Sequence, residues 1–409
     1  MQSLRSGHQI QLLQGGGAFF PALIKAIDLS GHEVRLETYI FCIEAAGKQV
    51  AEALERAAGR GVAVYLVMDG VGTSGISVEW AQRFDAAGVK WRIFSPLGRL
   101  GVFIPSRWRR LHRKLCVVDG SVAFCGGINL LDDFFDPNHG ALDAARFDFA
   151  VRVNGPLVQT VHEVLTQFWL RLQATTTLRQ SDFKGTWRAL QEAVSKAMKF
   201  RVTPDKEADL VMSPVGEHLI SADLVLRDNV LNRTRIERAY RHAIGSAQQE
   251  IIIANAYFLP GRKLRMGLIH AAQRGVRVRL LLQGRYEYFM QYHATRPVYG
   301  ALLAAGVEIH EYSVSFLHAK VAVIDGHWAT VGSSNLDPLS LLLAREANVV
   351  VDDVHFAQDL RARLVLAMAQ GGERVDPATY ANRPWHQRLL GRLAFGFMRI
   401  LLFLYGKRY

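Results

Sequence analysis

The chain of 409 residues contains one unusual pattern twice, and this internal repeat constrains its fold more than any other feature. HRKLCVVDG begins at His112, and HAKVAVIDG begins at His318. Further pairs of segments match in the same order along the chain: 32–41 with 249–258, 56–70 with 270–284, and 85–94 with 303–312. Chance similarity does not explain this order, so we interpret the chain as two copies of one unit.

Each copy alternates β-branched runs with Ala-rich stretches, which is typical of an α/β fold. We predict strands at 62–67 and 276–282 and helices at 48–58 and 264–273. Two copies imply a pseudo-two-fold pair of lobes with matching sites facing each other across their interface. The predicted units are a first lobe, a helical connector, a second lobe and a C-terminal segment: 1–170, 171–210, 211–370 and 371–409.

The repeated pattern places a histidine and a lysine on one face of a strand. His112 and Lys114 are two residues apart, so their side chains leave the same face, and the same holds for His318 and Lys320. Each strand then ends in Asp-Gly, at Asp119 and Asp325, which is a tight-turn signal. Their odd offset from the histidines indicates that these aspartates shape the strand end and do not transfer protons.

Small residues and an asparagine follow each turn, at the same offset from each histidine. Asn129 and Asn335, together with Ser333, offer donors to phosphoryl oxygens, and the glycines let a ligand approach the backbone. Two imidazoles with two lysines suit a phosphodiester. One histidine can attack phosphorus to form a phospho-histidine, while the other protonates the leaving oxygen.

A nucleophilic imidazole needs a partner that fixes its tautomer, and a carboxylate usually supplies it. Asp148 and Glu346 each open a strand-like run after the asparagine loop, and we predict that they orient the histidines. Metal binding is the rival chemistry, but a lysine beside each histidine would repel a divalent cation. The chain also has no phosphate-binding loop of the G-x-x-x-x-G-K-[ST] type. We therefore expect no metal and no other cofactor.

The doubled His-x-Lys-x₄-Asp pattern, each copy followed by Gly-Gly/Ser-x-Asn, resembles the phospholipase D superfamily. The resemblance implies two α/β/α-sandwich lobes with one active site at their interface. It also implies a catalytic set, with the aspartates as members of the motif, and a set that binds phosphate. The catalytic set is His112, Lys114, Asp119, His318, Lys320 and Asp325, and the phosphate set is Asn129, Ser333 and Asn335. Gly127 departs from the pattern, because Ser333 stands at its place in the second copy.

An insert before the first histidine favours a lipid substrate. The stretch from Gly88 to His112 is longer than that from Gly306 to His318, and the additional residues 96–110 mix arginines with apolar side chains. Such a mixture, like the net charge of +12, suits an anionic membrane surface, although single-stranded nucleic acid is an alternative. We assign membrane or acceptor contact, and closure over a second anionic lipid, to this insert, with four residues named: Arg107, Trp108, Arg109 and Arg110.

The C-terminal segment predicts an amphipathic helix. Arg388, Arg392 and Arg399 fall within about 40° of one another on a helix, and the rest of the circumference is apolar. The apolar run is short and interrupted for a membrane span, so we expect the helix to lie in the membrane interface. A helix that packs on the protein core is the alternative.

Three segments resemble those of bacterial cardiolipin synthases of the short type: 10–27, 227–244 and 251–261. That resemblance implies transfer of a phosphatidyl group between two phosphatidylglycerol molecules, with phosphatidylethanolamine as another possible donor and no nucleic acid as partner. A phospholipase or nuclease that uses water as acceptor, and a non-catalytic membrane-binding protein, remain alternatives. The N-terminus lacks the apolar core of a signal peptide. We therefore expect a peripheral protein at the cytoplasmic face of the bacterial inner membrane.

Overall fold

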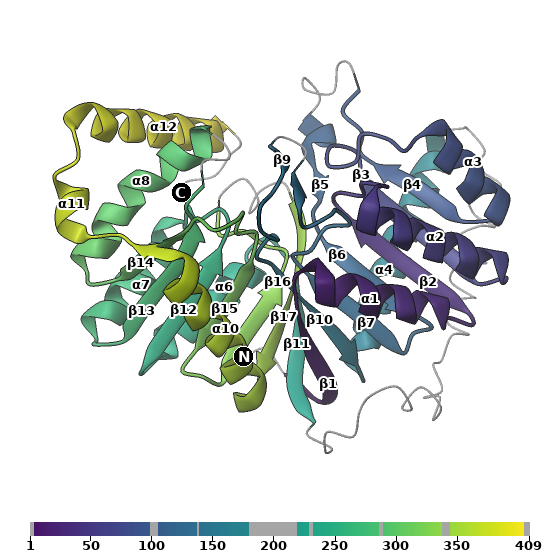
Figure 1. The fold of residues 1–409 in the computed structure, drawn as a ribbon, viewed down its shortest axis with the longest axis horizontal. Coiled ribbons are helices and arrows are strands. Elements are labelled where there is room, and N and C mark those ends of the chain that lie inside the picture. Colours follow the sequence, from purple (N-terminus) through teal and green to yellow (C-terminus); the bar gives the residue numbers. More distant parts are fainter. Residues whose placement is uncertain are drawn as a thin grey trace.

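The computed structural model describes residues 4–98, 105–136, 139–179, 219–228, 232–285, 289–337 and 344–404. These residues form two lobes that lie side by side, one from each half of the chain (Figure 1). The helices of each lobe cover the faces of a sheet, as the alternating pattern predicts.

The first lobe contains, in chain order, β1 (Arg5–Gln14), α1 (Gly15–Asp28), β2 (Glu33–Thr38), α2 (Ala45–Gly59), β3 (Ala63–Asp69), α3 (Val78–Ala87), β4 (Lys90–Phe94), the 3₁₀ turn η2 (Pro105–Trp108), β5 (Arg110–Leu111), β6 (Lys114–Val118), β7 (Val122–Gly126), β8 (Phe135–Asp136), β9 (Gly140–Ala141), β10 (Phe149–Asn154) and α4 (Leu157–Arg179).

The second lobe contains β11 (Ile220–Arg227), α6 (Arg235–Ser246), β12 (Glu250–Asn255), α7 (Arg262–Gln273), β13 (Arg277–Gln283), α8 (Phe289–Ala304), β14 (Glu308–Tyr312), β15 (Lys320–Ile324), β16 (Trp328–Gly332), β17 (Ala344–Asp352), α10 (Val354–Gly371), β18 (Gly372–Arg374), α11 (Pro377–Ala381) and α12 (Trp385–Leu404). The four elements named from sequence correspond to α2, β3, α7 and β13.

The two halves repeat one sheet topology. The first lobe has the strand order β4-β3-β2-β6-β7-β10-β1, and the second has β14-β13-β12-β15-β16-β17-β11, with β18 added at the outer edge. In each lobe the three outer strands of this order are parallel and the others antiparallel. β1 pairs with β11, so one sheet runs through both lobes. The predicted α/β fold of two related lobes is confirmed.

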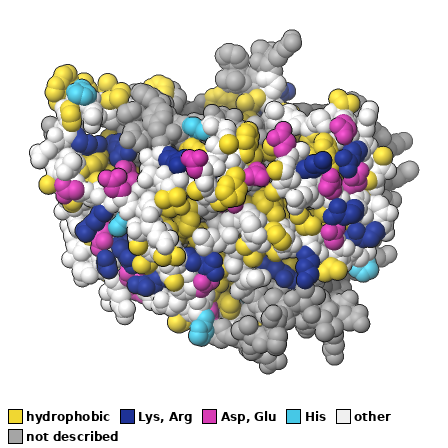
Figure 2. Space-filling view, viewed as in Figure 1, with side chains coloured by type: hydrophobic (Ala, Val, Ile, Leu, Met, Phe, Trp, Pro, Cys, Tyr) yellow, Lys and Arg dark blue, Asp and Glu magenta, His cyan; other side chains and the backbone are white. Residues whose placement is uncertain are grey.

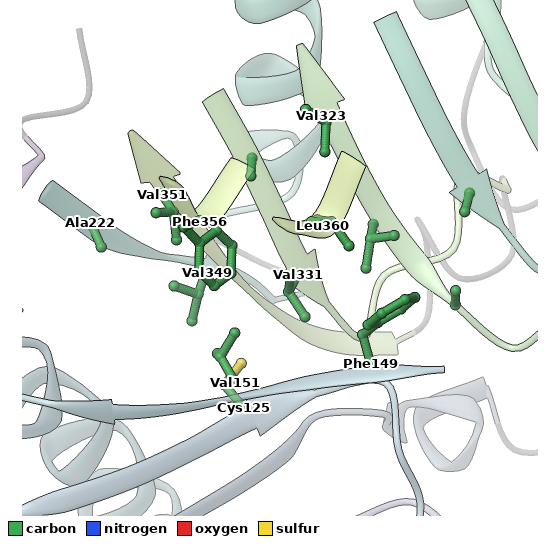
Figure 3. Packing of buried hydrophobic residues seen from close by; sticks show 14 of the residues in the cluster. Cys125, Phe149, Val151, Ala222, Val323, Val331, Val349, Val351, Phe356 and Leu360 are labelled. Atoms are coloured by element: carbon green, nitrogen blue, oxygen red, sulfur yellow. The ribbon is translucent and has the colours of Figure 1, made fainter. Parts of the chain in front are cut away.

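A shared hydrophobic core holds the lobes together. Cys125, Phe149 and Val151 of the first lobe point toward side chains of β16, β17 and α10 in the second (Figure 3). All of these residues are buried. Residues far apart in sequence therefore form one core, and the relative position of the two lobes is fixed by packing as well as by the β1–β11 pairing.

The boundaries of the lobes differ from the predicted ones at two places. Helix α4 continues past residue 170 to Arg179, and 180–218, most of the predicted connector, lies outside the described residues. The predicted C-terminal segment begins with β18, which pairs with β14 and so belongs to the sheet of the second lobe. Among the helices that the structure describes, none has the length and apolar character needed to cross a membrane.

The repeated Ala-Ala-Gly-Val segments mark a helix end in both lobes. Gly88 ends α3 with a φ of 86°, and Gly306 follows α8 with a φ of 87°. A left-handed residue at this position closes the helix and is available to glycine at little cost. The start of α3 is also set by a neighbouring residue, because the side chain of Ser77 caps the helix by accepting a hydrogen bond from the amide of Trp80.

The motif aspartates anchor strand ends. The carboxylate of Asp119 accepts hydrogen bonds from the amides of Gly31, His32 and Glu33 at 2.7–2.8 Å. Asp325 accepts three in the same way in the second lobe, from residues 248–250. Both aspartates have a φ near 50°, which the Asp-Gly turn requires. They lie at the far end of β6 and β15 from the histidines, so their part in this structure is to hold the turn.

We expect Asp325→Ala to lower the free energy of unfolding by about 1–3 kcal/mol, because three amides lose a charged acceptor. Burial acts to raise the pKa of Asp325, but the three amides outweigh it and lower the pKa below its usual value. The stabilisation is therefore present at neutral pH and is lost as the pH falls through this lowered pKa. Urea unfolding at pH 7 and at acidic pH measures both effects. An unchanged unfolding midpoint at pH 7 would rule out the anchoring role.

Candidate active site

Each histidine is tied to the opposite lobe through its backbone. The amide of His112 donates to the carbonyl of Arg345 at 3.0 Å, and the amide of His318 donates to the carbonyl of Phe147 at 2.9 Å. β5, just before His112, also pairs with the start of β17. The residue after each accepting carbonyl is a carboxylate, so the carboxylates are brought to the histidines by the backbone pairing itself.

The carboxylates and histidines pair across the lobes. His112 Nδ1 lies 3.0 and 3.1 Å from the two carboxylate oxygens of Glu346, and His318 Nδ1 lies 2.6 Å from Asp148 Oδ2. Both carboxylates are buried and both imidazoles are only slightly exposed. A carboxylate at Nδ1 favours a proton there and leaves Nε2 as the reactive nitrogen. The structure brings together all four residues that the sequence singles out for this purpose.

The two lysines are buried beside the histidines. Lys114 Nζ donates to the carbonyl of His112 at 3.0 Å, and Lys320 Nζ donates to the carbonyl of His318. Burial lowers the pKa of Lys114 to about 7; Glu346 opposes this shift, and the neighbouring Lys320 adds to it. The positive charge of Lys320 disfavours that of Lys114, so a neighbouring anion would stabilise both ammonium groups, and a phosphodiester is such an anion.

The same burial acts on the imidazoles. It lowers the pKa of His112, an effect that Glu346 opposes and the Lys114 ammonium increases. It lowers the pKa of His318 further, with Lys320 and Lys114 both adding to the shift. Burial also raises the pKa of Asp148 to about 7, although Lys320 acts against it. The site therefore favours neutral imidazoles. A phosphodiester bound beside the lysines would instead raise the pKa of both histidines.

The two half-sites differ at the position of Gly127 and Ser333. The hydroxyl of Ser333 donates to Glu346 Oε2 at 2.5 Å, and the side chain is fully buried. In the first lobe, a Cβ at Gly127 would lie 2.3 Å from Asp148 Oδ1, so only glycine fits. We predict from sequence that Ser333 binds phosphate; in this structure its hydroxyl instead supports the carboxylate that faces His112.

The two asparagines lie just beyond β7 and β16 on the active-site edge. The side-chain oxygen of Asn129 accepts a hydrogen bond from the amide of Ile40 at 3.2 Å, which fixes its orientation. Asn335 is buried, and its Oδ1 has no hydrogen-bond partner among the residues that the structure describes. Their phosphate-binding role stays a prediction, and the amide groups of both residues are the donors that it would use.

The described part of the insert is held to its own lobe. Arg110 binds Asp69 at 3.1 Å, and Arg107 donates to the carbonyl of Leu97 at 3.0 Å. The buried carboxylate at the end of β3 attracts Arg110 inward, and the membrane or acceptor contact of the insert stays a prediction. Trp108 is half-buried and Arg109 is exposed, so Arg109 best fits the expected surface contact.

Sequence reasoning missed two sets of site residues. Asp69 accepts from the amide of Leu111 at 2.7 Å, and Gln283 accepts from that of Leu317 at 3.1 Å, so each holds the residue before one of the two motif histidines. Their matched places in the repeat were the available signal. The second omission is Tyr39, whose ring contacts His112. In the described part of the chain, no group of three or more His, Cys, Asp or Glu side chains is arranged to hold a metal.

Comparison with known proteins gives one consistent result. The family model described as "Cardiolipin synthase, PLD-like domain" matches residues 23–167 and 240–365. The chain is 38% identical over 397 residues to cardiolipin synthase B of Escherichia coli K12, which covers 97% of this chain and 89% of that protein. Cardiolipin synthase B of Salmonella typhi is 37% identical over 395 residues, with the same coverage.

Among solved structures, phosphatidylserine synthase of Haemophilus influenzae aligns with a TM-score of 0.64 at 12% identity and covers 96% of this chain and 93% of its own. Polyphosphate kinase of Porphyromonas gingivalis aligns with a TM-score of 0.52 at 11% identity, over 88% of this chain and 50% of its own. At these identities the likeness concerns the fold alone.

Proposed function

Because the chain belongs to the cardiolipin synthase family of phospholipase D-like proteins, we propose that it moves a phosphatidyl group from one phosphatidylglycerol to another, which yields cardiolipin and glycerol. As a phosphatidyltransferase it exchanges one phosphodiester for another. Such an exchange leaves the number of phosphodiester bonds unchanged, so a nucleotide need not drive it.

The crossed pairing of two histidines with two carboxylates carries this proposal. In the first step, Nε2 of His112 attacks phosphorus, the bond from phosphorus to the glycerol oxygen breaks, and His318 gives its proton to that oxygen. In the second step, His318 takes a proton from the acceptor hydroxyl. The acceptor oxygen then displaces His112 from phosphorus. We assign the attack to His112 by resemblance to the family.

The buried lysines set the charge of the proposed site. The ammonium groups of Lys114 and Lys320 donate to the backbone carbonyls of the two histidines. From this position they can also contact the non-bridging oxygens of a phosphodiester. An anion there would offset their charge and raise the pKa of His318, which favours the protonated form that the first step needs. Asn129 and Asn335 would contribute uncharged donors to the same oxygens.

A product assay tests the proposed function. Purified protein is given phosphatidylglycerol vesicles with and without added glycerol, and the lipids are identified by mass. We expect cardiolipin and free glycerol, with less cardiolipin when added glycerol competes as acceptor. Phosphatidic acid as the main product under both conditions would identify a hydrolase instead. Vesicles containing phosphatidylethanolamine test the alternative donor.

The outer face of α12 supports contact with a membrane surface. Trp385, Leu389, Leu393 and Phe397 recur every fourth residue and are 47–71% exposed. The opposite face packs on α8 through Ala394, which is buried. Hydrophobic side chains are visible over α12 at the upper left of Figure 2. An exposed apolar stripe at helical spacing suits the bilayer interface, and the side chains of Arg388, Arg392 and Arg399 lie outside the described residues.

We expect the double variant Leu389→Glu/Leu393→Glu to lose most of its binding to anionic vesicles, because two charges replace apolar groups that would enter the interface. Sedimentation with phosphatidylglycerol vesicles measures this. Leu366→Glu, on the exposed face of α10, is the matched control and should bind as the unchanged protein does. Equal binding of the double variant and the control would remove α12 from the contact.

A further inference from the structure

Tyr39, just after β2, lies against the catalytic pair of the first lobe. Its ring centroid is 4.8 Å from that of His112, with an angle of 60° between the planes. Lys114 Nζ is 5.5 Å from the same ring centroid. The tyrosine is half-buried, so the ring covers one side of the imidazole at the edge of the site.

The second lobe has no such ring at the matched position. In the repeat, 32–41 corresponds to 249–258, so Ala256 stands where the first lobe has Tyr39. The pairing of β2 with β6 and of β12 with β15 has the same register in both lobes, which confirms the match. Ala256 is buried. The two histidines therefore have matched backbone partners and each a carboxylate at Nδ1, and the first lobe has an aromatic ring at a position where the second has Ala256.

The face of an aromatic ring attracts a cation within about 6 Å. The charged and titratable groups that face His112 are Glu346 from β17, Lys114 from β6, Lys320 from β15 and His318 of the opposite half-site. Glu346 favours a positive charge on His112, whereas Lys114 and Lys320 oppose it. A phosphoryl group on Nε2, or a proton there, gives the imidazole that charge.

We propose that Tyr39 is a positioning residue of the first half-site, whose ring fixes the imidazole of His112 and stabilises the cationic form of that imidazole as well as the neighbouring Lys114 ammonium. This inference rests on the proposed phosphatidyl transfer. Tyr39 is then a second difference between the half-sites, besides Gly127 and Ser333. Its ring acts in the steps in which His112 gains or loses its positive charge.

Three variants test the ring. Tyr39→Phe keeps it, and Tyr39→Leu removes it. Tyr65→Leu is the control, because Tyr65 also contacts cationic side chains, Arg35 and Lys90, but lies on β3 away from the histidines. Turnover of phosphatidylglycerol is first measured for the unchanged protein, and its absence would count against the proposed function. We expect kcat to fall about 5- to 30-fold in Tyr39→Leu, with little change in KM, and to stay near the original value in Tyr39→Phe.

The pH profile separates positioning from general loss of structure. In Tyr39→Leu the limb of the kcat–pH profile that reports His112 should move to lower pH, because the cationic imidazole is less favoured without the ring. In Tyr39→Phe, which keeps the ring, this limb should stay in place. Thermal unfolding checks that Tyr39→Leu and Tyr65→Leu lose similar stability. An unchanged kcat in Tyr39→Leu, or an equal fall in Tyr39→Phe, would overturn the inference.

Discussion

Either histidine replaced by alanine is expected to reduce turnover by about 10³-fold or more, because attack and leaving-group protonation belong to one reaction. His112→Ala and His318→Ala should be similarly inactive, and the double variant should be no worse than either, since residues that act as a unit are not additive. Steady-state formation of cardiolipin, with thermal unfolding of each variant, measures this.

The matched control is His327→Ala. His327 also pairs through Nδ1 with a carboxylate, Asp352 at 2.8 Å, but this pair is exposed and lies at the turn after β15. We expect its turnover to equal that of the unchanged protein. Substantial activity in both single variants of the central histidines would mean two independent half-sites and would contradict the shared site.

Changes to the orienting carboxylates are expected to lower kcat by about 100-fold each. Asp148→Asn replaces an acceptor by an amide that can donate to Nδ1 of His318 and so favours the wrong tautomer. Glu346→Gln does the same to His112 in the other lobe. The measurement is the pH dependence of kcat, in which the limb that reports the affected histidine should move. A change of less than about threefold in both variants would remove the carboxylates from the mechanism.

The fold and the residues around the two histidines could largely be predicted from the sequence, apart from Tyr39, Asp69 and Gln283. The repeat indicated two α/β lobes, and the doubled His-x-Lys pattern placed His112 and His318 at one interface. The carboxylates could be named because Asp148 and Glu346 have matched places after the asparagine loops. Motifs of this kind are local, so a single chain reveals them without any knowledge of tertiary contacts.

That each histidine pairs with the carboxylate of the opposite lobe could not be predicted from the sequence. Which carboxylate meets which histidine depends on the pairing of His112 with Arg345 and of His318 with Phe147, and these contacts join lobes that are far apart in the chain. The inward turn of Arg110 has a similar cause, because Asp69 reaches it only after β3 and β5 are in place. The hydrogen bond from the Ser333 hydroxyl to Glu346 likewise depends on the fold, and phosphate binding by Ser333 stays a prediction.

The mass of the intact protein, quenched with denaturant at alkaline pH during turnover of phosphatidylglycerol and followed by peptide mapping at the same pH, tests the central claim of one shared site most directly. We predict at most one phosphatidyl adduct per chain, carried by a single histidine, His112, and absent from His112→Ala. Adducts on His112 and His318 of the same chain would contradict a single site with two unlike histidines.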